Sequence, residues 1–132
     1  MQNRKFLFTV WPIPGHFYPT IAIGRALSAR GHEVAFYTGS RACGLIRQEG
    51  FRCFPFRQLD EEQIYRILFS DYRSPRPWQR ARQYQTMLRK WLLETIPGQI
   101  ADLQELCSSW QPEVLISDPT VWGPILILQE TL

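Results

Sequence analysis

Residues 5–38 decide the fold class of this chain; they read KFLFTVWPIPGHFYPTIAIGRALSARGHEVAFYT. Residues 5–10 form a nearly continuous apolar run of strand length, which is typical of a strand buried on both faces of a parallel sheet. After a loop at residues 11–18, Pro19 suits the first position of a helix that ends at Gly31. Residues 34–38 then form a second apolar strand. This order of strand, helix and strand predicts a parallel sheet.

The alternation continues further along the chain. We expect a helix at 40–48 that stops before Gly50, a strand at 51–56, and a helix at 60–69 followed by a stiff break at 74–77. A longer helix then runs from Trp78 to Pro97 and Gly98, followed by a helix at 100–107, a strand at 114–117 and a helix from Trp122. We predict one α/β domain over residues 1–132, a Rossmann-like doubly wound parallel sheet with right-handed crossovers. Its last helix has no C-terminal cap, so the sequence is interpreted as truncated.

Composition excludes several classes of protein. The 132 residues are 45% hydrophobic and 20% charged, which is typical of a globular chain and not of a disordered one. No apolar run reaches the ~20 residues of a membrane-spanning helix. The three cysteines, Cys43, Cys53 and Cys107, show no CxxC spacing or adjacent histidine pair, so we expect neither a disulfide framework nor a metal site. A reducing, cytoplasmic setting fits this pattern best.

Charge is concentrated in one segment. Residues 72–93 contain six basic and no acidic residues, while the whole chain has a net charge of +3. The cations are interleaved with Trp78, Tyr84 and Trp91. Two interpretations stay open: an amphipathic helix whose apolar residues face the core or a ligand cleft, or a peripheral contact with an anionic membrane. The small net charge argues against nucleic acid binding. The cations are Arg73, Arg76, Arg80, Arg82, Arg89 and Lys90.

Two loops that follow strands carry reactive side chains. In an open parallel sheet, ligands bind beyond the carboxyl ends of the strands. The loop after the first strand holds His16, and residues 117–120, SDPT, place Asp118 just after the last strand. If the loops converge, the carboxylate can fix the imidazole tautomer and leave the other ring nitrogen as a general base. The alternative is a loop histidine and a capping aspartate without chemistry.

Other motifs are absent, and two residues have structural interpretations. The sequence lacks GxGxxG, GxxxxGK[ST], HExxH and GxSxG, which argues against dinucleotide enzymes, P-loop NTPases, metal hydrolases and serine hydrolases. We assign His32 a structural role at the start of the second strand. Gly24 lies inside the first helix, where glycine is unfavourable, which indicates close packing against the sheet.

The same residues resemble the opening of GT-B glycosyltransferases of the UDP-glycosyltransferase type. The resemblance covers residues 4–56 and 113–124, and the segment between them is similar mainly in length and helical character. It implies that the chain is the amino-terminal, acceptor-binding half of such an enzyme, without its carboxy-terminal donor-binding domain. The matching residues are Gly15, His16, Pro19, Ala26, Leu27, the run RGHEV at 30–34, Asp118, Trp122, Gly123 and Pro124.

The resemblance also implies a reaction: inverting transfer of a sugar from a nucleotide sugar, a UDP-sugar, to a hydroxyl of an apolar small-molecule or lipid acceptor. His16 would be the general base and Asp118 its partner, with Gly15, Phe17, Tyr84 and Trp122 contacting substrate. No metal or further cofactor is expected. The missing donor domain would act in cis or in trans, and the chain alone would be inactive. The alternatives are a non-catalytic α/β module that binds a ligand or partner, and an unrelated nucleotide-binding domain.

Overall fold

A four-stranded parallel sheet forms the centre of the molecule. The computed structural model describes residues 2–70 and 75–130. The strands are β1 (Lys5–Thr9), β2 (Glu33–Thr38), β3 (Arg52–Pro55) and β4 (Val114–Ser117), in the order β3-β2-β1-β4. Every neighbouring pair is parallel, and Phe8 of β1 lies opposite Phe36 of β2 and Ile116 of β4. The predicted doubly wound α/β fold is therefore confirmed.

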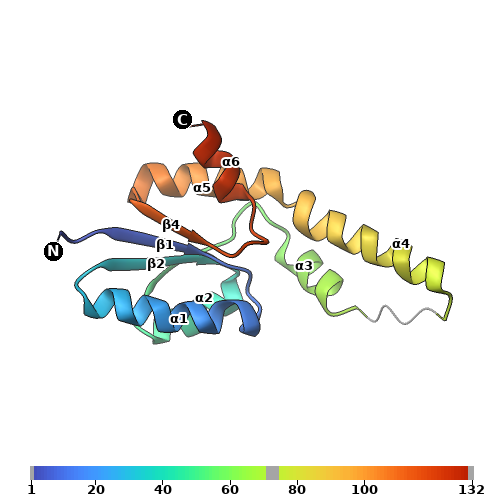
Figure 1. Cartoon of the computed structure of the whole chain (residues 1–132), viewed down its shortest axis with the longest axis horizontal. Coiled ribbons are helices and arrows are strands. Elements are labelled where there is room, and N and C mark those ends of the chain that lie inside the picture. The colour runs from blue at the N-terminus through green and yellow to red at the C-terminus, as the bar shows by residue number, and fades with distance from the viewer. Residues whose placement is uncertain (1, 71–74, 131–132) are drawn as a thin grey trace.

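Helices cover both faces of this sheet. Helices α1 (Pro14–Ala29) and α2 (Ser40–Gln48) lie on one face, and α5 (Ile96–Trp110) and α6 (Gly123–Glu130) lie toward the other (Figure 1). Helix α3 (Glu61–Leu68) follows β3, and α4 (Pro77–Leu88) extends away from the sheet. A π-helical turn, η1 (Arg89–Leu93), separates α4 from α5. The arrangement is an α/β/α sandwich with an extended helical arm.

Side chains of β1 alternate between two core layers. Phe8 and Val10 join the layer under α1 and α2, where the rings of Phe8 and Phe36 stack with centroids 4.9 Å apart. Leu7 and Trp11 join the layer on the α5 side. Because both faces of the strand are buried, its sequence is apolar almost throughout.

Helix α1 begins earlier than expected. The carbonyl of Ile13 accepts hydrogen bonds from the backbone N–H groups of His16 and Phe17, at 2.8 and 3.1 Å. Pro14, not Pro19, therefore occupies the first turn, where the missing proline N–H has no helical partner to lose. Pro19 lies inside the helix. The prediction of a loop is therefore wrong for residues 14–18, and His16 lies on the first turn of a helix.

Close packing explains the glycine inside α1, as predicted. A Cβ on Gly24 would lie 3.3 Å from the ring of Phe36 and 3.4 Å from Phe51 and Val34. His32 has the predicted structural position, because its Nδ1 accepts a hydrogen bond from the backbone of Arg4 at 3.3 Å.

The helical region after α3 differs from the prediction. Pro97 and Gly98 lie in the first turn of α5 and begin that helix, whereas the sequence analysis placed a helix end there. The physical reason is the same as in α1, since a proline in the first turn sacrifices no helical hydrogen bond. Of the predicted break at 74–77, Ser74 lies outside the described residues.

The expectation that the cysteines form no disulfide is wrong. Cys43 of α2 and Cys53 of β3 form a disulfide, with Cα atoms 5.4 Å apart. The chain turns back between α2 and β3, so two residues without a recognisable spacing motif meet in the core. Cys107 is a free thiol. The reducing, cytoplasmic setting was inferred partly from unpaired cysteines and loses that support.

Within residues 2–70 and 75–130, no helix is both long enough and apolar enough to cross a membrane.

Candidate functional site

His16 and Asp118 meet at the carboxyl edge of the sheet, where the strand order reverses. From β1 the sheet continues through β2 to β3 on one side and to β4 on the other. Such a switch point is where open α/β sheets bind ligands, because the connections leave in opposite directions and open a crevice. His16 lies in the first turn of α1, the helix that follows β1, and Asp118 directly follows β4. The backbone N–H of Asp118 donates to the carbonyl of Thr9 at 2.9 Å, which fixes the two segments side by side.

The two side chains are hydrogen-bonded to each other. Nδ1 of His16 pairs with Oδ2 of Asp118. The side chain of Asp118 is 8% exposed and that of His16 is 30% exposed. A carboxylate on Nδ1 holds the proton there, so the lone pair of a neutral imidazole lies on Nε2. Nε2 has no hydrogen-bond partner among the described residues, and His16 retains solvent access.

A tight turn presents the carboxylate. The N–H of Val121 donates to the carbonyl of Asp118 at 2.9 Å, closing a turn over residues 118–121. Aspartate in the first position and proline in the second are both favoured in such turns. Oδ1 of Asp118 accepts two hydrogen bonds from Thr120, one from its backbone N–H at 2.8 Å and one from its hydroxyl at 2.5 Å.

These contacts set the charge of Asp118. Burial by itself would raise the pKa of the carboxyl, but the Thr120 hydroxyl, the Thr120 N–H and His16 more than offset that effect. The pKa of Asp118 therefore lies below its ordinary value. An ionised Asp118 can stabilise a proton on His16.

Two of the other predicted site residues, Gly15 and Trp122, lie next to the pair in the chain or in its turn. Gly15 lies beside His16 in the first turn of α1, with open space around it. The indole N–H of Trp122 donates to the carbonyl of Pro119 at 3.0 Å, so Trp122 closes the turn that holds Asp118.

Two of the proposed substrate contacts are not at this site. Phe17 is 2% exposed and packs into the core under α1, because one helical step turns it away from His16. Its assignment to an acceptor pocket is corrected accordingly. Tyr84 is 56% exposed on α4, the helix that extends away from the sheet (Figure 1).

A hollow of about 580 Å³ lies between residues 12–14, α2 and α3. The ring of Tyr65 in α3 stacks on the ring of Phe69, which directly follows that helix, with centroids 6.0 Å apart. The side chain of Phe69 is 69% exposed. The guanidinium of Arg41 lies 4.4 Å from the Tyr65 ring. Sequence analysis missed these residues, although aromatic side chains four positions apart on a helix were a signal for them. The lining residues are Pro12, Pro14, Arg41, Glu62, Tyr65, Arg66 and Phe69.

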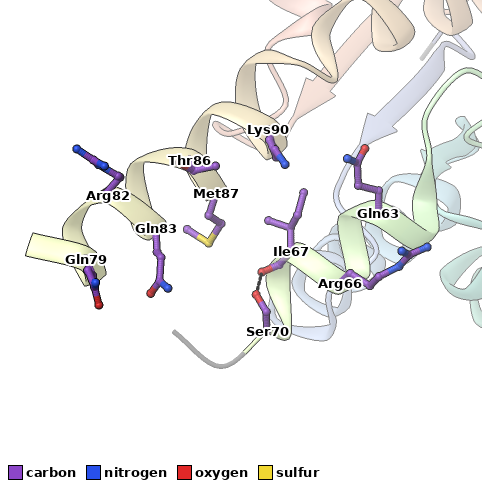
Figure 2. A pocket seen from close by; sticks show the side chains of 10 residues that line it. All are labelled: Gln63, Arg66, Ile67, Ser70, Gln79, Arg82, Gln83, Thr86, Met87 and Lys90. Carbon is purple, nitrogen blue, oxygen red and sulfur yellow. Dashed lines mark hydrogen bonds between the residues drawn. The ribbon is translucent and has the colours of Figure 1, made fainter. Parts of the chain in front are cut away.

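A second cavity, of about 640 Å³, lies between α3 and α4. Figure 2 shows Ile67 of α3 and Met87 of α4 projecting toward each other, with Gln63 and Lys90 at one end. Two members of the predicted basic segment, Arg82 and Lys90, line it. Arg73 lies outside the described residues.

The aromatic residues of the basic segment divide between surface and core. Trp78 is 68% exposed, whereas Trp91 packs against the core with its ring 5.6 Å from Trp11. In the part of the chain that the structure describes, no three His, Cys, Asp or Glu side chains are grouped so that they could hold a metal ion.

Comparison with known proteins gives no matching family model. Demethyllactenocin mycarosyltransferase of Streptomyces fradiae is 25% identical over 121 residues, which are 91% of this chain and 26% of the relative. The 4'-demethylrebeccamycin synthase of Lentzea aerocolonigenes is 23% identical over an alignment of 140 positions, which covers 98% of this chain and 31% of the relative. The chain thus spans less than a third of the length of the curated relatives it matches.

Solved structures show the same relationship. The glycotransferase of kitacinnamycin and the calicheamicin glycosyltransferase CalG4 each superpose with a TM-score of 0.72, at 15% and 16% identity. Both matches cover 99% of this chain, and 29% and 31% of those chains. The glycosyltransferase VinC, solved in complex with DTDP, has a TM-score of 0.60 at 22% identity. The fold is that of GT-B glycosyltransferases, and the resemblance seen in the sequence is confirmed.

Proposed function

We propose that this chain, which has the fold of GT-B glycosyltransferases, is the acceptor-binding part of an inverting glycosyltransferase in which His16 is the general base and Asp118 orients it. The observation that carries the proposal is the hydrogen bond between His16 Nδ1 and Asp118 Oδ2 at the switch point of the sheet. Relatives that act as glycosyltransferases support sugar transfer as the reaction.

In the proposed reaction, the pair activates the acceptor hydroxyl. Nε2 of His16 takes the proton of an acceptor hydroxyl as its oxygen attacks the anomeric carbon of the donor. The bond from that carbon to the diphosphate breaks, and the nucleoside diphosphate leaves with the electron pair. Asp118 stabilises the imidazolium through Nδ1. A positioned base of this kind typically contributes ~10² to 10⁴ in rate.

The donor is proposed to be a nucleoside diphosphate sugar held by a further domain, in cis or in trans, without a metal or further cofactor. The sequence resemblance favoured a UDP-sugar. Two neighbours in fold, VinC and SsfS6, were solved with thymidine diphosphate, so dTDP-sugars are tested beside UDP-sugars. We propose that this chain alone does not complete a turnover.

The acceptor is proposed to be apolar. Tyr65 and Phe69 offer stacked rings in the hollow that Pro12 and Pro14 also line. A lipid acceptor would additionally require contact with a bilayer. For that, α4 offers exposed Trp78 and Tyr84 beside Arg80 and Arg82. Sedimentation with anionic phosphatidylglycerol vesicles separates the two cases, because a small-molecule enzyme stays in the supernatant.

A chimera tests the catalytic proposal. The chain is joined to the remaining part of demethyllactenocin mycarosyltransferase, and release of nucleoside diphosphate is measured with dTDP- and UDP-sugars and a panel of hydroxylated apolar acceptors. We expect His16→Ala to lower turnover at least a hundredfold and Asp118→Asn to lower it less.

His32→Ala is the matched control, since His32 lies at the other end of the sheet next to Arg4. Undiminished turnover in His16→Ala would remove the general-base assignment. A chimera that binds acceptors but transfers no sugar would favour the non-catalytic binding module.

A further inference from the structure

We propose that Thr120 is a positioning residue of the pair: its hydroxyl anchors one oxygen of Asp118 so that the other faces His16. The inference rests on the proposed function of His16 and Asp118. Oδ1 of Asp118 accepts from the Thr120 hydroxyl at 2.5 Å and from the Thr120 N–H at 2.8 Å, while Oδ2 pairs with Nδ1 of His16. Each carboxylate oxygen thus has its own partner.

The division of partners matters because a carboxylate rotates easily about its last side-chain bond. A second donor on Oδ1 fixes the plane of the group and thereby the direction of the lone pairs on Oδ2. The imidazole then needs no reorganisation when it takes a proton. Among the described residues, His16 is the titratable group in contact with this carboxylate.

The turn itself is held by other contacts, so the role of the hydroxyl can be tested separately. The hydroxyl of Ser117 lies 3.0 Å from the carbonyls of both Asp118 and Val121. The N–H of Val121 and the indole of Trp122 add two more bonds to the same turn. Replacing Thr120 with valine removes the hydroxyl, keeps a β-branched side chain and leaves these bonds in place.

Nuclear magnetic resonance of the chain provides the first readout, which does not depend on catalysis. The chain has two histidines, so the ring signals of His16 are assigned with the His16→Ala variant. In Thr120→Val we expect the pKa of Asp118, followed by its carboxyl carbon, to rise because a donor to the ionised form is lost. We also expect the Nδ1 proton of His16 to exchange faster with water. Thr120→Ser, which keeps the hydroxyl, should restore both values.

Ser117→Ala is the matched control, because its hydroxyl contacts the same turn and not the carboxylate. It should leave the pKa of Asp118 unchanged. Thr120→Ala provides a second test if valine disturbs the fold, which amide spectra would reveal. An unchanged Asp118 pKa and Nδ1 proton in folded Thr120→Val or Thr120→Ala would overturn the proposal.

The chimera described above gives a second readout. Thr120→Val should lower kcat about tenfold, with little change in the KM of the acceptor and with recovery in Thr120→Ser. The two proposals fail separately. If His16→Ala abolishes transfer and Thr120→Val changes neither kcat nor the spectra, only the role of Thr120 is lost. If the spectra respond and His16→Ala transfers sugar normally, only the catalytic assignment is lost.

Discussion

The hydroxyl of Tyr37 lies 2.7 Å from Oδ2 of Asp102, a buried carboxylate on α5. The same carboxylate accepts from the backbone N–H of Arg57 at 2.9 Å and of Gln58 at 3.1 Å. These bonds join β2, the segment after β3 and α5. Burial, with the charge of Asp102 next in effect, raises the pKa of Tyr37 well above its ordinary value, so the phenol remains a donor. The network holds α5 on the sheet.

Replacing this carboxylate should destabilise the fold. In Asp102→Asn only one oxygen remains to accept from three donors, and hydrogen bonds to a charged group contribute about 1.5–3 kcal/mol. We expect a loss of this size in the free energy of unfolding, measured with urea. Glu105→Gln is the control on the same helix, since its ion pair with Arg57 is largely exposed and contributes about 1 kcal/mol or less. Equal stability of the two variants would contradict the role of the network.

Acid should weaken the link between α1 and the turn after β4. The pKa of Asp118 in the folded chain lies below its ordinary value, so the unfolded chain binds the proton more readily. The stabilisation is therefore present above the ordinary aspartate pKa and is lost as the pH falls through the lower, folded value. We expect the difference in unfolding free energy between the parent chain and Asp118→Asn to shrink as the pH falls through this range. Urea titrations between pH 5 and pH 2, at about half-unit intervals, measure it. A constant difference would contradict the assignment.

The disulfide should contribute to stability. Cys43 and Cys53 are separated by 10 positions, and a loop of that length corresponds to about 3 kcal/mol in the chain-entropy model. Because both sulfurs are buried, the reduced thiols stay in the core and the fold persists. Urea unfolding with and without dithiothreitol should show this loss, and Cys43→Ala with Cys53→Ala should abolish the response. Cys107→Ser should preserve it. Identical unfolding curves under both conditions would argue against the bond.

The sheet was predictable from two features of the sequence, its apolar runs of strand length and their alternation with helical segments. Continuous apolar runs such as residues 5–10 occur where helices cover both faces, and alternation with helical segments leaves few other topologies. The start of a helix was less predictable where two prolines were both suited to its first turn. Pro14 and Pro19 both suit a first turn, and the earlier start in the structure places Phe17 in the core.

The candidate site was predictable in part. His16 and Asp118 follow strands, and parallel strands bring the residues after them to one edge. The contact between them also depends on β4 lying next to β1, which no local pattern encodes. Thr120 was missed because its role depends on the conformation of the turn. The disulfide and Asp102 were missed because their partners come from other elements.

Gly98 tests the packing at the start of α5, with Gly44 of α2 as its control. A Cβ on Gly98 would lie 2.5 Å from the backbone carbonyl oxygen of Gln58, so main chain must move to accept it. Gly44 lies inside α2 with nothing within 4 Å of such a Cβ. We expect Gly44→Ala to stabilise the chain by about 0.5–1 kcal/mol, because alanine favours a helix interior. Gly98→Ala should lower stability by about 1–3 kcal/mol, as overpacking does. Thermal unfolding followed by circular dichroism compares them, and a gain in stability from both variants would show that α5 is not packed against residue 58.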